Sequence, residues 1–272
     1  MPGPNQQAGS DRMATTIDPR AVVSPKANLG CDVTVGPYTI IEDDVVIGDG
    51  TRIASNAFIA NGARIGRNCT VHHGAVVSNA PQDLKYAGEK TLFEIGDNTV
   101  VREFCTLHRG TVETGTSIVG KDCLLMAYVH VAHDCRVGDR CIFSNNATLA
   151  GHVEVGDWVT IGGLTPVHQF VKIGSHAMIG GGLRVVQDIP PYVLAGREPM
   201  RFEGINFIGL RRRGFTQEQI GVIEKAYHVL YSSGLMFSEA VSKIEKEFPP
   251  SNEVSTIVGF LKSSKRGIIR KS

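Results

Sequence analysis

The sequence predicts a mainly β protein, in which a parallel β-helix of short repeats is followed by a smaller α-helical region. Aliphatic residues recur every six positions from Ile17 to Val185, and a small or β-branched residue lies four positions after most of them. An α-helix requires a period near 3.6 and a flat strand a period of 2, so a period of six fits neither. It fits short strands that turn a corner, with three faces making a coil of about 18 residues.

The chain divides into three segments. Residues 1–12 are rich in Gly, Pro and Gln and precede a second methionine, so we assign them to a leader or a disordered tail. Residues 13–190 carry the repeat and should form roughly nine or ten coils. Residues 191–272 form the α-helical C-terminal domain.

The six-residue register breaks near residues 78–93 and 109–117, which are therefore expected to be loops that leave the β-helix. A solenoid gains no stability from such excursions, so we expect them to serve function. All cysteines except Cys31 fall on the small-residue position of the repeat. They are interpreted as buried apolar residues and not as disulfides or metal ligands, since no CxxC pair is present.

The helical region begins after Pro190-Pro191. Thr216 and Gln219 have the spacing of a capping box, which predicts a helix from there to about Tyr231. Further helices are expected over residues 237–248 and 253–263. An apolar face on the first of these helices predicts that the domain covers the open end of the coil.

Charge and hydropathy exclude several classes of function. With 28 basic and 27 acidic residues the net charge is +1, which provides no general field for nucleic acid or an anionic membrane. No run approaches the roughly 20 apolar residues of a membrane span. We expect a cytoplasmic protein with no membrane span, no nucleic-acid partner, no metal and no cofactor.

The segment from His130 to Cys135 alternates polar residues with core positions, which places His133 and Asp134 at a turn, facing outward. An imidazole in solvent accepts a hydroxyl proton near neutral pH when its other nitrogen is held by an acceptor. Gly151-His152 follows 18 to 19 residues later, so it should stack on this turn one coil further along.

His130, His133, His152 and His168 are then expected on one side of the prism, which favours a functional site. A zinc site is the competing interpretation, but nothing in the spacing marks a set of metal ligands.

Several motifs occur in order along the chain, and together they resemble the UDP-N-acetylglucosamine O-acyltransferases, the cytoplasmic hexapeptide-repeat enzymes that begin lipid A synthesis. The similarity runs from about Ile17 to Arg270 and is carried by residues 82–89, 107–111, 130–135, 145–152, 167–170 and 209–215. It implies a left-handed β-helix and a homotrimer with sites between neighbouring subunits. It also implies transfer of an (R)-3-hydroxyacyl chain from acyl carrier protein to the 3-hydroxyl of UDP-N-acetylglucosamine.

The resemblance also implies roles for individual residues. His133 would be the general base, Asp134 would orient it, and the Gly151 N–H would stabilise the oxyanion. The substrate-binding residues would be Asp83, Lys85, His130, His152, His168, Gln169, Gly181, Asn206, Arg212 and Arg213. Of these, Gly181 matches the position that limits acyl length, and the two arginines would hold phosphate or uridine.

One position departs from the family pattern, because Ile208 stands where an acid is expected, which puts a uridine or ribose contact in doubt. Basic residues of the helical domain are candidates either for docking the acidic carrier protein or for a solvated surface. Two other functions remain open: another hexapeptide acyltransferase, such as the later N-acyltransferase of the pathway or one acting on a 3-amino sugar nucleotide, and a trimeric scaffold or zinc enzyme.

Overall fold

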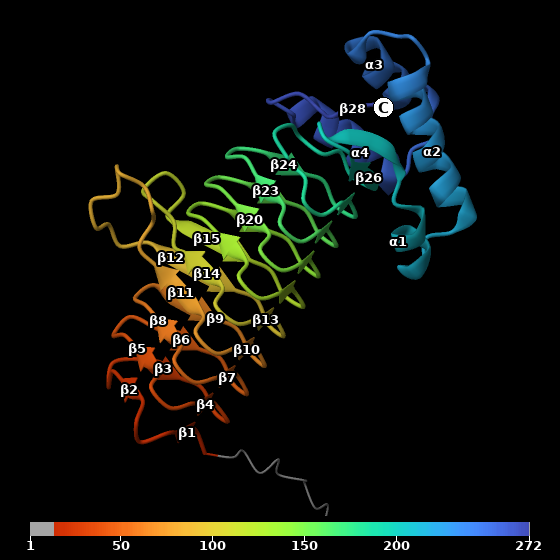
Figure 1. Cartoon of the computed structure of the whole chain (residues 1–272). Coiled ribbons are helices and arrows are strands. Elements are labelled where there is room, and N and C mark those ends of the chain that lie inside the picture. The colour runs from red at the N-terminus through yellow and green to blue at the C-terminus, as the bar shows by residue number, and fades with distance from the viewer. Residues whose placement is uncertain (1–13, 272) are drawn as a thin grey trace, which may run out of the picture.

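The computed structural model describes residues 14–271, so the expected leader or tail at residues 1–12 lies outside the described residues. Figure 1 shows a long solenoid whose coils stack along one axis, with the helices gathered at its C-terminal end. It is the left-handed parallel β-helix that the sequence and the resemblance predicted. Three parallel sheets, here called A, B and C, form its faces.

Sheet A extends beyond the solenoid into the C-terminal region. In spatial order it contains β1 (Thr16–Ile17), β4 (Thr34–Val35), β7 (Arg52–Ile53), β10 (Thr70–Val71), β13 (Val100–Val101), β16 (Leu124–Leu125), β19 (Ile142–Phe143), β22 (Thr160–Ile161), β25 (Met178–Ile179), β26 (Val193–Gly196), β27 (Arg201–Ile205) and β28 (Arg270–Lys271).

Sheets B and C each have eight strands. Sheet B contains β2 (Val22–Val23), β5 (Ile40–Ile41), β8 (Phe58–Ile59), β11 (Val76–Asn79), β14 (Thr106–His108), β17 (His130–Val131), β20 (Thr148–Leu149) and β23 (Pro166–Val167). Sheet C contains β3 (Asn28–Leu29), β6 (Val46–Ile47), β9 (Ala63–Ile65), β12 (Leu92–Ile95), β15 (Thr116–Val119), β18 (Arg136–Val137), β21 (Glu154–Val155) and β24 (Lys172–Ile173).

The six-residue period places one aliphatic side chain of each strand inside the prism. Val131 pairs with Leu149 in the next coil, 18 residues later, and both are fully buried. The small-residue position also faces inward, where Cys105, Cys135 and Cys141 are buried and reduced, as predicted. The core is therefore a stack of nearly identical layers, each held by its neighbours.

Two loops interrupt the stack without disturbing its register. Thr70 pairs with Val100, 30 residues on, because residues 80–91 leave the coil between β11 and β12. Val100 pairs with Leu124, 24 residues on, because residues 109–115 leave it between β14 and β15. Both loops emerge at the corner where sheet B meets sheet C, here called the B–C corner.

The C-terminal region contains four helices: α1 (Phe207–Arg212), α2 (Gln217–Ser232), α3 (Phe237–Glu247) and α4 (Asn252–Ser263). The capping box of Thr216 and Gln219 is present, and the last three helices lie where they were expected. Strands β26 and β27 were not expected, and β26 continues sheet A by pairing with β25. Tyr227 of α2 donates its hydroxyl to the Pro191 carbonyl at 2.6 Å, so the helices are fastened to the last coil.

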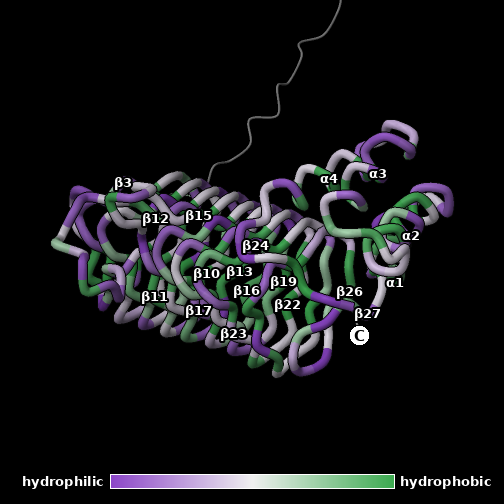
Figure 2. The backbone as a smooth tube through the Cα atoms, turned by 90° about the horizontal axis from the view of Figure 1, so that it is seen from above, coloured by the Kyte–Doolittle hydropathy of each residue, from purple (hydrophilic) through white to green (hydrophobic). Residues whose placement is uncertain are grey.

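Figure 2 shows hydrophobic segments along the strands and more hydrophilic segments in the projecting loops and helices. Within residues 14–271, no helix is both long enough and apolar enough to cross a membrane.

Candidate functional site

The site is built at the B–C corner between β17 and β18. Val131 and Cys135 point inward and have no exposed surface, so they fix the three residues between them, Ala132, His133 and Asp134, at the corner. Asp134 takes a left-handed backbone conformation with a φ of 60°, as does His152 one coil further along, with a φ of 61°. The 18-residue spacing therefore stacks equivalent corner residues directly over one another, as predicted.

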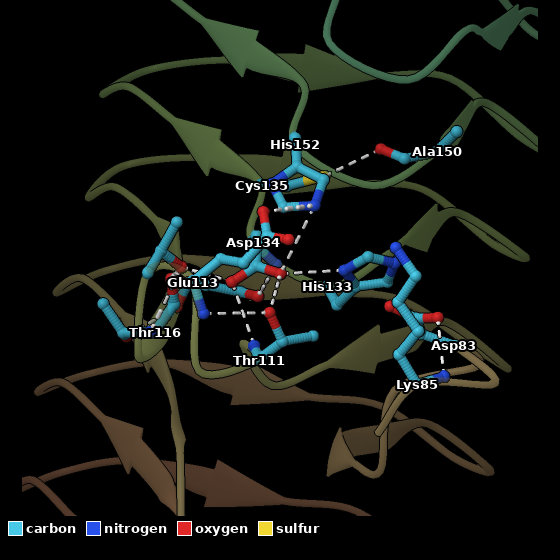
Figure 3. Close-up of polar contacts among 12 residues, drawn as sticks. Asp83, Lys85, Thr111, Glu113, Thr116, His133, Asp134, Cys135, Ala150 and His152 are labelled. Atoms are coloured by element: carbon cyan, nitrogen blue, oxygen red, sulfur yellow. Dashed lines mark hydrogen bonds and ion pairs between the residues drawn. The ribbon is translucent and has the colours of Figure 1, made fainter. Parts of the chain in front are cut away.

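His133 and Asp134 form a hydrogen-bonded pair (Figure 3). The distance from His133 Nδ1 to Asp134 Oδ2 is 2.8 Å. With the carboxylate ionised, Nδ1 carries the hydrogen, which leaves the Nε2 lone pair to accept a proton.

The expectation that both side chains face solvent is wrong. The His133 side chain is 15% exposed and the Asp134 side chain has no exposed surface. The cause is the loop at residues 109–115, whose Thr111 donates its N–H to Asp134 Oδ1 at 2.9 Å and its hydroxyl to Oδ2 at 2.8 Å. Thr114 also donates its hydroxyl to Asp134.

Burial alone would raise the pKa of Asp134, but the hydrogen bonds from Thr114, His133 and Thr111 outweigh it and lower the pKa to about 2. The carboxylate is therefore ionised throughout the neutral range. A permanently charged acceptor on Nδ1 stabilises the imidazolium that forms when His133 takes up a proton.

Gly151 lies directly against the His133 ring. A Cβ atom at residue 151 would be 2.6 Å from His133 Cε1 and 2.7 Å from Nε2. Among the described residues, no acceptor takes up the Gly151 N–H. An unused backbone donor beside the proposed base suits an anionic oxygen that forms there.

His152 packs on the other side of the pair. Its ring meets the His133 ring edge-on, with centroids 5.1 Å apart, and stacks on Phe170 at 4.6 Å. Its Nε2 lies 3.7 Å from Asp134 Oδ2 and 3.6 Å from Glu113 Oε2. The imidazole is thus fixed in place with one nitrogen between two carboxylates.

His133, Asp134 and His152 each bring one ligand atom within 4.8 Å of the others, which is close enough for a metal ion. The oxygens of Asp134 already accept hydrogen bonds from Thr111, Thr114 and His133, and an ion would displace them. The donor set fits an acid–base pair better than a metal centre.

His130 and His108 extend the site along sheet B. His130 Nδ1 is 2.7 Å from the Thr106 hydroxyl, and the His108 ring lies edge-on to it at 5.0 Å. Burial, with the neighbouring His130, His133 and Arg109, lowers the pKa of His108 to about 4. His108 Nδ1 is buried without a hydrogen-bond partner, so this neutral imidazole has an unused polar atom near His133.

The loop at residues 80–91 carries Asp83 and Lys85. Asp83 Oδ1 accepts the Lys85 N–H at 3.0 Å, and no described residue pairs with the Lys85 ammonium. Arg109 anchors the loop by donating to the Tyr86 hydroxyl at 2.9 Å and the Ser78 carbonyl at 2.9 Å. A free ammonium on an anchored loop suits an anionic ligand.

His168 and Gln169 occupy the B–C corner two coils beyond His133, and both are exposed. His168 Nδ1 lies 3.1 Å from the Gln169 carbonyl oxygen. The register in which β20 pairs with β23 places His168 over Ala150 and Gln169 over Gly151 of the preceding coil. His168 therefore lies beside the column of His133 and not within it.

The remaining predicted residues lie at other corners of the prism. Gly181 is on the turn between sheets A and B, three coils beyond the one that carries His133. The Asn206 side chain caps α1 by accepting the Gly209 N–H at 3.2 Å and donates to the His176 carbonyl at 2.9 Å. Within one chain, these residues and His133 do not share a site.

The two arginines of α1 and its C-terminus differ in their surroundings. Arg212 is exposed, and no described residue forms an ion pair with it. Arg213 is half-buried, with its guanidinium 5.3 Å from the Trp158 ring centre and Nη1 3.4 Å from His176 Nδ1. Ile208 is 65% exposed on the same helix.

Sequence reasoning missed three contributors: His108, Thr111 and Thr114. His108 and Thr111 lie within motifs that carried the family resemblance, but neither showed a spacing that assigned it a role. The threonines become visible only when the loop folds back onto Asp134.

Comparisons with known proteins agree with this architecture. The family described as Bacterial transferase hexapeptide (six repeats) matches residues 26–61, 44–79 and 116–151. The family described as Udp N-acetylglucosamine O-acyltransferase; Domain 2 matches residues 188–269.

Two curated relatives match nearly the full length of the chain. One from Thiobacillus denitrificans, named acyl-[acyl-carrier-protein]–UDP-N-acetylglucosamine O-acyltransferase, is 54% identical over 94% of this chain and 99% of its own. Another of the same name, from Xylella fastidiosa, is 47% identical over 96% of this chain and 100% of its own.

Solved structures of related enzymes also match nearly the whole chain. The UDP-N-acetylglucosamine acyltransferase of Bacteroides fragilis is 47% identical, covers 93% of this chain and 99% of its own, and superposes with a TM-score of 0.91. The LpxA structure from Acinetobacter baumannii is 42% identical with the same coverage and TM-score. The chain belongs to the UDP-N-acetylglucosamine O-acyltransferase family of hexapeptide-repeat acyltransferases.

Proposed function

We propose that this chain transfers an (R)-3-hydroxyacyl group from acyl carrier protein to the 3-hydroxyl of UDP-N-acetylglucosamine, the first step of lipid A biosynthesis, with His133 as the general base. The names of the curated relatives support the reaction and its two substrates. The single observation that carries the mechanism is the His133–Asp134 hydrogen bond, together with the packing of His133 Nε2 against Gly151.

In this reaction one proton moves from the sugar hydroxyl to His133 and then to the thiolate of the carrier protein. His133 Nε2 takes the proton of the sugar 3-hydroxyl as that oxygen attacks the thioester carbonyl. The carbonyl oxygen becomes an oxyanion, which the Gly151 N–H stabilises. When the intermediate collapses, the carbon–sulfur bond breaks and His133 returns the proton to the carrier-protein thiolate. No covalent enzyme intermediate, metal or cofactor is needed.

The other side chains of the corner would bind substrate. Asp83, His130 and His152 offer hydrogen bonds for the sugar, and Lys85 offers a cation for the diphosphate. His168 and Gln169 continue the same edge toward the acyl chain.

Gly181, Asn206, Arg212 and Arg213 reach this corner only from another copy, so we propose a homotrimer with each site shared by two subunits. The outward side chains of the three faces support this. Sheet A presents Leu124 and Ile142 and sheet B presents Ile40 and Phe58, whereas sheet C presents a charged series that includes Arg136 and Glu154. Apolar side chains that gather on a surface are typical of interaction sites. Sheets A and B would then meet between subunits, and sheet C would face solvent.

We place the enzyme in the cytoplasm, where acyl carrier protein and nucleotide sugars are found together. The candidate dock for the acidic carrier protein is the basic cluster of the helical domain, made of Arg211, Arg212, Arg213, Lys262, Lys265, Arg266, Arg270 and Lys271. Of these, Lys262 already pairs with Glu245 at 2.6 Å, so the others would supply most of the free charge.

The test is turnover of UDP-N-acetylglucosamine with 3-hydroxyacyl carrier proteins of several lengths. His133→Ala should lower kcat by roughly 10²- to 10⁴-fold, the usual contribution of a general base. His228→Ala is the matched control, because His228 is exposed on α2, away from the site. Folded His133→Ala enzyme with normal turnover would contradict the assignment. A parallel assay with a 3-amino sugar nucleotide distinguishes O-acylation from N-acylation.

A further inference from the structure

The backbone at Asp134 lacks a contact that its neighbours in the stack possess. The His152 N–H donates to the His133 carbonyl at 3.1 Å, and the Phe170 N–H donates to the Gly151 carbonyl at 3.2 Å. The coil that precedes Asp134 opens into the loop at residues 109–115, so the equivalent carbonyl is absent. The Asp134 N–H donates instead to the Ser117 hydroxyl at 2.7 Å.

The same loop surrounds the Asp134 side chain (Figure 3). Oδ1 accepts the Thr111 N–H at 2.9 Å and the Thr114 hydroxyl, and Oδ2 accepts the Thr111 hydroxyl at 2.8 Å and His133 Nδ1 at 2.8 Å. The Thr114 hydroxyl also lies 2.9 Å from the Thr116 carbonyl, but a carboxylate is the stronger acceptor. Each oxygen therefore has two donors, and three of the four come from the loop.

We propose that Thr111 and Thr114 are positioning residues, whose hydroxyls form a clamp that holds the Asp134 carboxylate in the one orientation that fixes the tautomer of His133. This inference rests on the proposed function of His133. The clamp gives the excursion at residues 109–115 a chemical purpose: it replaces a layer of the coil with donors aimed at a single carboxylate.

The physical reason is that the charge is fully buried. An ionised carboxylate without exposed surface depends on each of its donors, and losing one leaves a lone pair unsatisfied. Without the hydroxyls, the carboxylate can rotate toward the other imidazole beside it, that of His152, whose Nε2 lies 3.7 Å from Asp134 Oδ2 and 3.6 Å from Glu113 Oε2. His133 Nδ1 then loses its fixed acceptor, and the ring is free to adopt the Nε2–H tautomer, which cannot accept the substrate proton.

The experiment replaces each threonine by valine, which preserves shape and removes the hydroxyl. Thr111→Val and Thr114→Val should each lower kcat roughly tenfold, because a hydrogen bond to a charged group contributes at least that factor. The double variant should lose roughly 100-fold, with KM for both substrates changed less than about twofold. Thr111→Ser and Thr114→Ser, which retain the hydroxyl, should restore most of the activity.

Thr116→Val is the matched control, because Thr116 directly follows the loop, at the start of β15, and among the described residues its hydroxyl donates only to the Ser117 carbonyl, at 3.3 Å. A second readout is the nitrogen NMR spectrum of histidine-labelled full-length protein, with the His133 signals assigned by their loss in His133→Ala. Wild type should show the Nδ1–H tautomer at His133, and the double variant a mixture.

Two results would overturn the clamp. One is wild-type kcat in the folded double variant. The other is a loss of activity in which His133 keeps the Nδ1–H tautomer, because the loop would then act only as a structural support. Both are distinct from a failure of the proposed function, which would appear as normal turnover by His133→Ala itself.

Discussion

Replacing Gly151 by alanine tests the site most directly, because it adds one methyl group against the proposed base. That Cβ would lie 2.6 Å from His133 Cε1, whereas carbon atoms in contact are separated by about 3.5 Å. The ring must therefore move by about 0.9 Å. If the ring moves that far away from Asp134, the 2.8 Å hydrogen bond between His133 Nδ1 and Asp134 Oδ2 lengthens beyond the roughly 3.5 Å at which such a bond is lost.

We expect Gly151→Ala to lower kcat about 100-fold, the usual cost of misplacing a catalytic group by 1 Å. The fold should persist, since Gly151 is not among the glycines with positive φ and alanine restricts the unfolded chain. Alanine also keeps the backbone N–H, so the loss would report displacement of the ring and not removal of the oxyanion donor.

The assay is steady-state acyl transfer, with thermal unfolding measured on the same samples. Gly259→Ala in α4 is the matched control, because an added Cβ there meets nothing within 4 Å and should leave kcat unchanged. If Gly151→Ala turns over within threefold of wild type, the close packing of Gly151 on His133 has no catalytic importance and the geometric argument fails.

Two further predictions concern titrating groups. Asp134→Asn should lower kcat by about 10²- to 10⁴-fold by disturbing the His133 tautomer. Because the pKa of Asp134 is lowered to about 2, its ionised form stabilises the native state above pH 4 and this contribution is lost as the pH falls toward 2. The Tm difference between wild type and Asp134→Asn should shrink over that range, and a constant difference would contradict the prediction. His176 has its pKa lowered to about 4 by burial and by Arg213, so protonation favours the unfolded chain and stability should fall from about pH 6.5 to pH 4. His176→Phe should weaken this fall, as measured by Tm between pH 7.5 and 4.5, and an unchanged pH dependence would exclude His176 as a source.

The solenoid was predictable because its information is local and repeated. Each six-residue unit specifies one inward aliphatic residue and one small residue, so Val131 and Cys135 could be placed in the core without knowing any distant contact. Strands β26 and β27 were not predicted, because they follow Pro190-Pro191 outside the repeat, and β26 depends on β25 for pairing while β27 depends on β26. Their strand character comes from the neighbouring edge and not from their own period.

The candidate site was predictable to the extent that it follows the 18-residue register. That spacing by itself predicts that Gly151 and His152 stack on His133. The burial of Asp134 was not predictable, because it depends on how the loop at residues 109–115 folds back. Thr111 and Thr114 carry no periodic signal, and only the path of that loop shows which group their hydroxyls meet.

The stacked strands also give the site a built-in scale of length. Neighbouring parallel strands are separated by about 4.8 Å, and hydrogen bonds along all three faces prevent that spacing from stretching. Gly181 is three coils beyond the coil of His133, which corresponds to about 14 Å along the axis. The length of any groove that runs between these two levels can change only by whole coils, or through the size of a side chain on one coil. Selection for a longer or shorter ligand in such a scaffold would therefore proceed in discrete steps, through substitutions at corners, while the proposed base His133 stays in place.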